Sequence, residues 1–477
     1  MNRMNVWPRK TKAVFSVLLV ALALAGCTVG PNYVRPPAVT PEAFKEMDGW
    51  KKAEPADHLL RGTWWEIFND SQLSALEEQI SISNQNVAAA EAQFRQARAL
   101  VQVARSAYFP IATVGPSFSR SFQATPQAPS VPVSLVTLPV DVTWEPDLWG
   151  RVRRSVEASR TSAQASAADL QGVLLSSQAQ LAESYFQLRA LDAQSRILNE
   201  TVEAYRKSLE LTVNKYQSGV VSRGDVLQAD TQLKTTQAQA IDVGVQRAQL
   251  EHAIALLIGK PPSNFSLPDL ALDTLPPAIP VGVPSVLLER RPDIAGAERR
   301  MASANAQIGV ALAAYYPSVT LTGEVGYETV NLAKWFTWPT RFWGFGPSVS
   351  EIVYDGGLRK AQTEQARAAY DGAVASYRQT VLTGFQEVED NLAALRILEQ
   401  EAKTQAEAVK LAEQSLDVVT NQYKSGTVAY LNVIVAQTIV LSNKLTALNI
   451  LGRRMTAAAL LIKALGGGWN VAQLPAG

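Results

Sequence analysis

Long helical tracts account for most of the pattern of apolar and polar residues along this chain. Residues 150–217 and 357–424 each run for more than sixty residues without a proline, and narrow apolar stripes cross a sequence rich in Ala and Gln. At ~1.5 Å per residue, each tract predicts a helix of ~100 Å, far longer than the average globular helix. Narrow stripes favour helices packed side by side in a curved wall that is wet on both sides.

Shorter helices and pairs of strands surround the two long tracts. Helices are predicted over residues 71–107 and 285–314, and each long tract is followed by a returning helix that ends near Ile258 or Leu465. Strands are predicted at 111–123, 133–145, 318–329 and 344–354, with the clearest alternation in SVTLTGEVGYET. Two strands of about ten residues joined by a loop have the length of a membrane-spanning hairpin. The pattern therefore predicts an α+β fold that is mostly α.

Aromatic residues crowd the loop between the last two predicted strands. One interpretation is a small hydrophobic cluster under the loop. We prefer the aromatic belt of a membrane interface, because the loop joins strands of spanning length. The residues assigned to this belt are Trp335, Phe336, Trp338 and Trp343.

An internal duplication organises the chain. Residues 214–231 and 421–438 are identical at 8 of 18 positions, and each segment has a glycine, Gly219 or Gly426, between two helical stretches. Glycine readily takes the left-handed φ that ends a helix, so each copy predicts the turn at the tip of a helical hairpin. The offset of 207 residues (426 − 219) also relates AYFP to AYYP and extends over roughly 88–259 and 295–466. Such a long period indicates two structural copies that form one body.

This organisation divides the chain into six parts. They are a signal peptide (1–26), a lipidated N-terminal linker (27–63), a first structural repeat (64–262), a proline-rich linker (263–284), a second structural repeat (285–469) and a C-terminal tail (470–477).

The N-terminus has the features of a secretion signal. Basic residues precede an apolar run of 13 residues, Ala13 to Ala25, which would span ~20 Å and is too short for a bilayer core of ~30 Å. The run ends in Leu-Ala-Gly followed by Cys27, the only cysteine. This sequence resembles a bacterial lipobox, which implies cleavage before Cys27 and its acylation, and Thr28 after it favours the outer membrane. The alternative is a plain secretory signal with an incidental cysteine.

Composition excludes several functions. One Cys and two His exclude a disulfide framework and most Cys/His metal sites, and no cofactor is expected. Without residues 1–26 the chain has 40 basic and 43 acidic residues, a net charge of −3, which gives no reason to expect nucleic acid as a partner. Glu387, Glu389 and Asp390 form an acidic cluster on a predicted helix, but a catalytic pair needs an enclosed pocket, so we interpret them as a solvated face or lumen charge. The chain is not expected to be an enzyme.

The predicted strands require an assembly if they enter a membrane. Four strands cannot close a barrel, and open strand edges are not tolerated against lipid. Several chains would therefore pool their strands, and three chains would supply twelve. The alternative is an ordinary antiparallel coiled coil with a small β-domain.

Several segments in order along the mature chain resemble TolC-like outer-membrane factors, in the lipoprotein branch that serves resistance-nodulation-division efflux pumps. The resemblance implies a homotrimer with a twelve-stranded outer-membrane β-barrel and a twelve-helix periplasmic tunnel, docked to a periplasmic adaptor (membrane fusion protein) and an inner-membrane pump. The segments that carry it are Cys27 with GPNYVRP at 30–36, Trp64, Trp65 and Phe68, LERRPDI at 288–294, AYYPS at 314–318, DGG at 355–357, FQEVEDNL at 385–392, YKSG at 423–426, and ALGGGW at 464–469.

The resemblance also implies a gate at the hairpin tips. In that family, acidic residues at the second tip ring a constriction, but this chain has Asn432 and Val435 at the corresponding positions. We therefore expect a closed state that depends on packing, with charge supplied from the first tip. The candidate gate residues are Tyr423, Tyr430, Leu431, Asn432, Arg223 and Asp225. The alternative for Asp225 is that it caps the returning helix.

The expected function is a passive outer-membrane exit duct for small amphiphilic compounds such as drugs or toxic metabolites, driven by a separate pump and in contact with outer-membrane lipid. Two alternatives stay open. One is a duct for type I protein secretion, against which the lipobox and the GGGW ending weigh. The other is a structural coiled-coil lipoprotein that crosses the periplasm.

Overall fold

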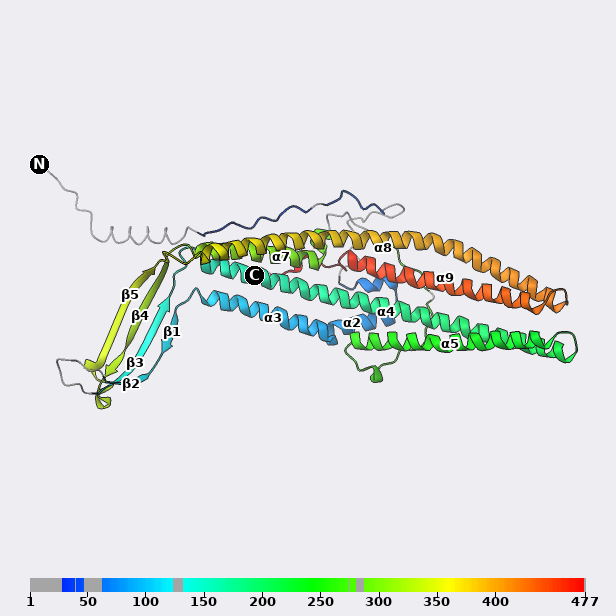
Figure 1. Ribbon diagram of the computed structural model, residues 1–477, viewed down its shortest axis with the longest axis horizontal. Coiled ribbons are helices and arrows are strands. Elements are labelled where there is room, and N and C mark those ends of the chain that lie inside the picture. Colours follow the sequence, from blue (N-terminus) through cyan, green and yellow to red (C-terminus); the bar gives the residue numbers. More distant parts are fainter. Residues whose placement is uncertain are drawn as a thin grey trace.

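The chain forms an elongated body with a β-sheet at one end and two helical tips at the other (Figure 1). The computed structural model describes residues 28–38, 40–46, 62–122, 132–272, 274–279 and 287–475. The signal peptide and Cys27 lie outside the described residues.

Two sets of elements follow each other along the chain. The first set is α2 (Ser71–Ser83), α3 (Gln85–Ser106), β1 (Ile111–Val114), β2 (Ser117–Ser121), β3 (Val133–Trp144), α4 (Arg151–Gln217) and α5 (Arg223–Leu257). The second set is α6 (Leu287–Arg290), α7 (Pro292–Ala313), β4 (Ser318–Thr329), β5 (Arg341–Ser350), α8 (Leu358–Lys424) and α9 (Tyr430–Ala464). Short 3₁₀ helices include η2 (Trp64–Phe68) and η3 (Pro262–Asn264). α4 and α8 have 67 residues each, a length of ~100 Å.

The offset of 207 residues seen in the sequence relates the helices at both of their ends. α3 and α7 begin at 85 and 292 and end at 106 and 313, and the same offset relates α4 to α8 and α5 to α9. Left-handed glycines recur in the same way, at the pairs 150/357, 219/426 and 259/466. The chain therefore contains two copies of one helical unit.

Each copy has a break in its first helix. The sequence predicts residues 71–107 as one continuous helix, whereas Pro292 within 285–314 indicates a helix start. In the first copy Asn84 takes an extended conformation between α2 and α3, and its side-chain oxygen accepts hydrogen bonds from the N–H groups of Asn86 and Val87 at 2.9 and 3.0 Å. Its amide also donates to the carbonyl oxygen of Leu257 at 2.7 Å. In the second copy Arg291 stands at the break and donates to the carbonyl oxygen of Ala464 at 3.2 Å. The two breaks thus cap the ends of α5 and α9, whose last carbonyls lack a partner within the helix.

The strands form an antiparallel sheet in the order β1-β3-β4-β5, and β2 also pairs with β3. The predicted strand 111–123 is split into β1 and β2 around Gly115 and Pro116, because proline has no N–H to donate to the ladder. The predicted strand 344–354 is shifted: β5 begins at Arg341, opposite Tyr327, and ends at Ser350, opposite Ser318. After β5, the carbonyl of Ile352 accepts a hydrogen bond from the Arg359 side chain and not from the backbone of a neighbouring strand.

The main core lies midway along the body, where both copies meet. η2 inserts Trp64, which is fully buried, and Phe68, whose ring lies 4.8 Å from that of Phe186 on α4. The same cluster includes Tyr377 and Phe385 from α8 and Met455 from α9. Burying such large side chains provides most of the favourable free energy of folding.

The N-terminal segment, residues 28–46, follows the outside of the helical body away from the sheet. It begins where Val29 donates to the carbonyl oxygen of Trp149 at 3.1 Å, just before α4. Further along, the Tyr33 hydroxyl donates to Glu298 on α7 at 2.7 Å. At its far end the backbone N–H groups of Lys45 and Glu46 donate to Glu389 at 2.7 and 3.0 Å. Residues 28–46 are hereafter called the strap.

Two members of the acidic cluster have structural partners, which corrects the interpretation as a free solvated or lumen face. Glu389 accepts the two hydrogen bonds from the end of the strap. Glu387 accepts a hydrogen bond from Arg291 at 2.7 Å. These partners are far away in sequence, so the local pattern on α8 did not indicate them.

Glu77 on α2 is a fully buried carboxyl group, and neither of its oxygens has a hydrogen-bond partner. Burial raises its pKa well above the usual value. Because the pKa of Glu77 is higher in the folded than in the unfolded chain, its contribution to stability is fully present below the unfolded pKa. This contribution is lost as the pH rises through the folded pKa.

We therefore expect Glu77→Gln to raise the apparent melting temperature, and to raise it more at pH 8 than at pH 5, because glutamine does not ionise. An unpaired buried polar group costs about 1–3 kcal/mol, so Glu77→Leu should stabilise the protein further. The neighbouring Glu78 is exposed, and Glu78→Gln serves as the control in thermal denaturation at a fixed scan rate. Equal shifts for both glutamine variants, or no dependence on pH, would contradict this assignment.

Candidate functional site

The sheet has one apolar and one polar face. Paired residues of neighbouring strands share a face, so the register places Val142 beside Gly323 and Val140 beside Val325, which pairs with Trp343. The other residues of this apolar face include Ala112, Val114, Phe118, Val136, Leu138, Trp144, Val319, Leu321, Phe345 and Val349. Several are highly exposed, with Trp343 at 80% and Phe345 at 74%.

The opposite face of the sheet carries hydroxyl and carboxyl groups. Asp141 pairs directly with Glu324, Thr143 with Thr322, and Thr137 with Glu328. Like charges opposite each other across two strands destabilise a sheet unless water solvates them. This arrangement suits a sheet with lipid on one side and water on the other.

Both edges of the sheet are open within the described residues. β1 and β2 form one edge, and β5 forms the other, and no described strand pairs with their outer sides. An unpaired edge exposes backbone N–H and C=O groups, which hydrocarbon cannot solvate.

The four aromatic residues assigned to an interfacial belt lie at the end of the sheet that is distal to the helices. Phe336 and Trp338 are exposed in the β4–β5 loop, and Trp343 follows on β5. Trp335 is half-buried and stacks on Phe336 with ring centroids 5.2 Å apart. The loop thus has features of both interpretations: a local ring contact and large aromatic surfaces that stay exposed.

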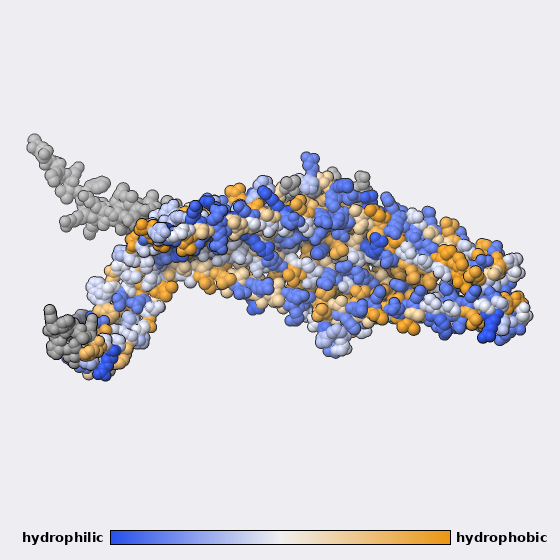
Figure 2. All heavy atoms as spheres, in the orientation of Figure 1, coloured by the Kyte–Doolittle hydropathy of each residue, from blue (hydrophilic) through white to orange (hydrophobic). Residues whose placement is uncertain are grey.

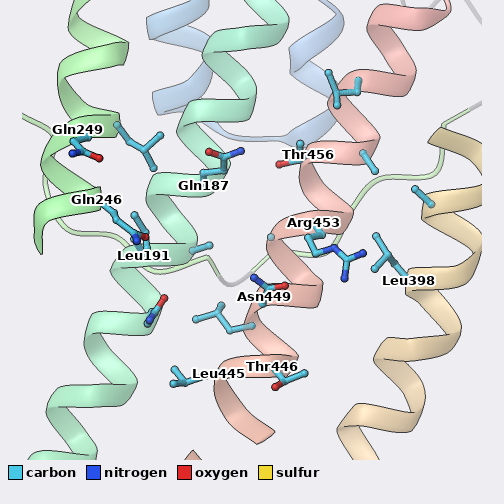
Figure 3. A pocket seen from close by; sticks show the side chains of 18 of the residues that line it. Gln187, Leu191, Gln246, Gln249, Leu398, Leu445, Thr446, Asn449, Arg453 and Thr456 are labelled. Atoms are coloured by element: carbon cyan, nitrogen blue, oxygen red, sulfur yellow. The ribbon is translucent and has the colours of Figure 1, made fainter. Parts of the chain in front are cut away.

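A hollow of about 1020 Å³ lies between the two helical hairpins (Figure 3). Its walls come from α4, α5, α8 and α9. On α4 the exposed Gln187 lines the hollow, whereas the neighbouring Tyr185 and Phe186 are buried in the main core. Arg453 is the only charged side chain among the described residues that line it. Its polar lining consists otherwise of uncharged amides and hydroxyls: Gln187, Gln194, Gln246, Gln249, Asn391, Ser442, Thr446, Asn449 and Thr456.

At the helical tips, two candidate gate residues form a small buried cluster. The rings of Tyr423 on α8 and Tyr430 on α9 lie 5.2 Å apart, and both side chains are almost fully buried with Ala229 of α5 and Val433. Burial raises the pKa of Tyr430, so its hydroxyl stays protonated. That hydroxyl lies 3.0 Å from the hydroxyl of Ser208 on α4.

The cluster also connects the first hairpin to the second. Lys215 near the end of α4 donates to the carbonyl oxygen of Tyr423 at 2.7 Å, and its ammonium lies 4.0 Å from the centre of the Tyr423 ring. Thr212 approaches the hydroxyl of Tyr423 at 3.4 Å. Ser208, Thr212 and Lys215 were not among the sequence candidates, because lysine, serine and threonine on a long polar helix carry no distinctive signal.

The remaining tip candidates lie outside this cluster. Leu431 is 53% exposed, and Asn432 and Arg223 are also exposed. Asp225 forms a capping box with Ser222: the Ser222 N–H and hydroxyl both donate to its carboxylate at 2.9 Å, and Asp225 N–H donates back at 3.3 Å. Gly219 and Gly426 turn the chain with φ of 75° and 81°. The capping role of Asp225 is thus present, whereas a role in a constriction stays a prediction.

Apolar side chains also reach the surface of the helices (Figure 2). On α5 they are Ile241, Val245 and Leu256, and on α8 they are Leu382, Ile397, Leu411 and Val418. Among the described helices, α9 alone is long and apolar enough to cross a membrane, yet it packs against α8 and α4. Its apolar window is only 22% buried. These surfaces are available for contact with another chain.

No group of three or more His, Cys, Asp or Glu side chains that could hold a metal ion occurs in the described part of the chain. The described residues form instead an amphipathic sheet, long helices and a hollow lined mainly by uncharged polar groups.

Comparisons with known proteins agree with this geometry. The model of the family described as outer membrane efflux protein matches residues 76–260 and 283–467. The toluene efflux pump outer membrane protein TtgC of Pseudomonas putida is 28% identical over 467 residues, which cover 96% of each chain. The cation efflux system protein CusC of Escherichia coli is 27% identical over 455 residues, 94% of this chain and 98% of CusC.

The fold of the chain is also similar to that of a solved structure. The outer-membrane channel OprN superposes with a TM-score of 0.87 at 30% identity, over 93% of this chain and all of the OprN chain. Both halves of the chain match one family model, and the match extends over most of its length. The chain therefore belongs to the outer membrane efflux protein family.

Proposed function

We propose that this chain is the outer-membrane exit duct of a tripartite efflux pump, through which small amphiphilic compounds leave passively. The sheet carries the proposal: it has an exposed apolar face, a polar face with carboxylates, and two open edges. Such a sheet satisfies its backbone in lipid only by joining other strands into a closed barrel. Of the relatives named above, TtgC is an outer membrane protein of a toluene efflux pump and CusC is a protein of a cation efflux system.

A homotrimer is the assembly that we propose. Three chains would pool their strands into a twelve-stranded barrel, with β5 of one chain beside β1 and β2 of the next. Exposed apolar side chains on α5 and α8, such as Ile241 and Leu411, support packing between chains along the helices. The helices would then form a periplasmic tunnel, with a periplasmic adaptor and an inner-membrane pump at its far end.

The amide-lined hollow supports passive transport of varied compounds. A conduit conducts only if its wall binds a solute weakly enough to release it. Uncharged amides and hydroxyls with a single Arg453 per chain provide hydrogen bonds without a strong charge. The pump, and not the duct, would supply selectivity and energy.

Planar-bilayer recording tests this function directly. The purified full-length protein should migrate as a trimer in detergent and give discrete conductance steps when added to a bilayer. In cells that lack their own exit duct, its expression with the adaptor and pump should restore resistance to toxic amphiphiles. A monomer without conductance would refute the duct and favour the structural coiled-coil lipoprotein.

We further propose that Tyr423, Tyr430, Leu431, Asn432, Arg223 and Asp225 form or adjoin a constriction at the tips. Asp225→Asn should then lower the preference of the channel for cations, because three symmetry-related carboxylates in a narrow pore attract them. Asparagine retains a side-chain oxygen that can accept from Ser222, so the helix cap is largely preserved. The reversal potential in a salt gradient measures the effect, and Glu78→Gln, far from the tips, is the control. An unchanged reversal potential would leave Asp225 with a capping role alone.

We propose Cys27 as the lipid attachment site, with the acyl chains in the membrane beside the sheet. The support is the position of Thr28, which adjoins Gly150 at the joint between β3 and α4. Cys27→Ser should abolish incorporation of labelled palmitate while Thr28→Ser leaves it intact. Continued labelling of the Cys27→Ser protein would rule out this site.

A further inference from the structure

The distal end of the apolar face carries cations. Arg341 forms the last pair of the β4–β5 ladder with Tyr327, on the same face as Val325 and Trp343. Arg120 pairs with Ser134 at the last apolar-face position of the β2–β3 ladder. Both are exposed, as is Lys334 in the β4–β5 loop. An arginine at this boundary can extend its charge to the polar side of a membrane interface.

These cations have no carboxylate partner in the part of the chain that the structure describes. None of the salt bridges among the described residues involves Arg120, Lys334 or Arg341. The nearby acids Glu324 and Glu328 lie on the opposite face of the sheet. The sequence between β2 and β3, residues 122–132, also contains no Asp or Glu.

The helical end of the same sheet differs. Arg151 pairs with Glu145 at 2.7 Å, Arg153 with Asp147 at 3.1 Å, and Arg359 with Asp355 at 2.6 Å. These three arginines are therefore paired within the chain, whereas the three distal cations have no salt bridge to any described residue and can accept an external anion. This asymmetry matches a membrane whose two surfaces differ in the charge of their headgroups.

An aromatic ring holds one of the distal cations in position. The guanidinium of Arg341 lies 3.3 Å from the centre of the Trp338 ring, and Trp338 itself is 79% exposed. A cation–π contact orients the guanidinium and leaves its N–H groups free for a second partner. Arginine donates two parallel hydrogen bonds to phosphate.

We propose that Arg120, Arg341 and Lys334 bind the phosphate groups of glycolipid headgroups in the outer leaflet. The inference rests on the proposed trimer, in which β5 of one chain lies beside β2 of the next. That pairing brings Arg341 of one chain near Arg120 of its neighbour, both on the lipid face. Each of the three contacts between β5 of one chain and β2 of the next would then bind one bisphosphorylated headgroup. The headgroup would hold the two neighbouring chains together.

The test uses the purified full-length trimer and bisphosphoryl lipid A as the probe, with native mass spectrometry as the readout. The wild type should bind up to three molecules per trimer. A form of the lipid without phosphate should bind with an affinity at least about tenfold lower. The double variant Arg120→Gln/Arg341→Gln should lose a similar factor. Arg120→Lys/Arg341→Lys, which retains the charges, should keep most of the binding. Arg151→Gln at the helical end is the matched control and should bind like the wild type.

Equal binding of the lipid with and without phosphate would overturn the inference, and so would unchanged binding by the double glutamine variant. If that variant fails to assemble, the comparison of the two lipids on the wild type still decides. The same preparations are recorded in planar bilayers. Normal conductance without phosphate-dependent binding refutes this inference alone, whereas absence of wild-type conductance refutes the proposed duct.

Discussion

Replacing Gly466 by alanine is expected to prevent accumulation of the folded protein. Gly466 follows α9 with φ +95°, and a Cβ atom there would overlap the carbonyl oxygen of Arg290. The backbone itself blocks this position, so no side-chain rotation relieves the overlap. We expect the overlap and the left-handed conformation together to lower the free energy of unfolding by about 3 kcal/mol or more. This is a large part of the stability of a typical domain.

Two other glycines provide graded controls for this variant. Gly426 also has a left-handed φ, of +81°, but open space around it, so Gly426→Ala should cost about 1–2 kcal/mol. Gly372 lies within α8 in open space, and Gly372→Ala should stabilise by about 0.5–1 kcal/mol. The yield of trimer and its apparent melting temperature measure the series. Gly466→Ala as stable as Gly372→Ala would refute the explanation by backbone overlap.

Arg291→Met is expected to have the second-largest effect. The guanidinium of Arg291 is almost fully buried and donates to Asp293 at 2.7 Å, to Glu387 at 2.7 Å and to the carbonyl of Ala464 at 3.2 Å. Methionine fills similar space but leaves Glu387 and the last carbonyl of α9 without their donor. Removing one member of a buried ion pair costs about 3–5 kcal/mol. Because Glu387 is partly exposed, we expect a value at the lower end, measured by thermal denaturation.

The first copy supplies a matched comparison for Arg291. Asn84 occupies the corresponding break and donates to the carbonyl of Leu257, but it carries no charge. Asn84→Ala should therefore cost less, about 1–2 kcal/mol, through loss of a helix cap. The variant Glu387→Gln in the Arg291→Met background separates the ion pair from the capping bond. If Asn84→Ala were as costly as Arg291→Met, the buried charge would not be the main contribution.

The repeated elements could be predicted well from the sequence because they depend on local patterns. Proline-free tracts defined α4 and α8, the alternation in SVTLTGEVGYET defined β4, and the glycines defined the turns. The break at Asn84 and the contact of Arg291 with the end of α9 were missed, since both depend on partners that lie 173 residues away. Local propensity contains no information about such partners.

The contacts of the candidate site could not be predicted from the sequence. Tyr423, Tyr430 and Leu431 were selected as residues that close the tips by packing; Tyr423 and Tyr430 pack together within one chain, whereas Leu431 is 53% exposed. The sequence could not show that Lys215 of the other hairpin contacts the ring of Tyr423. It also could not reveal the distribution of Asp141 and Glu324 on one face of the sheet, because that depends on strand register.

The offset of 207 residues relates the elements of the two copies, but the chemistry at their tips differs. If three chains close into a ring, six hairpins of nearly equal shape point toward the cell interior. Arg223 and Asp225 occupy every second hairpin, and Leu431 and Asn432 occupy the others. An adaptor that contacts all six tips would then meet two kinds of surface in alternation, one with Arg223 and Asp225 and one with the exposed Lys424. Identical adaptor subunits would therefore bind the two kinds of tip with different affinities and salt sensitivities.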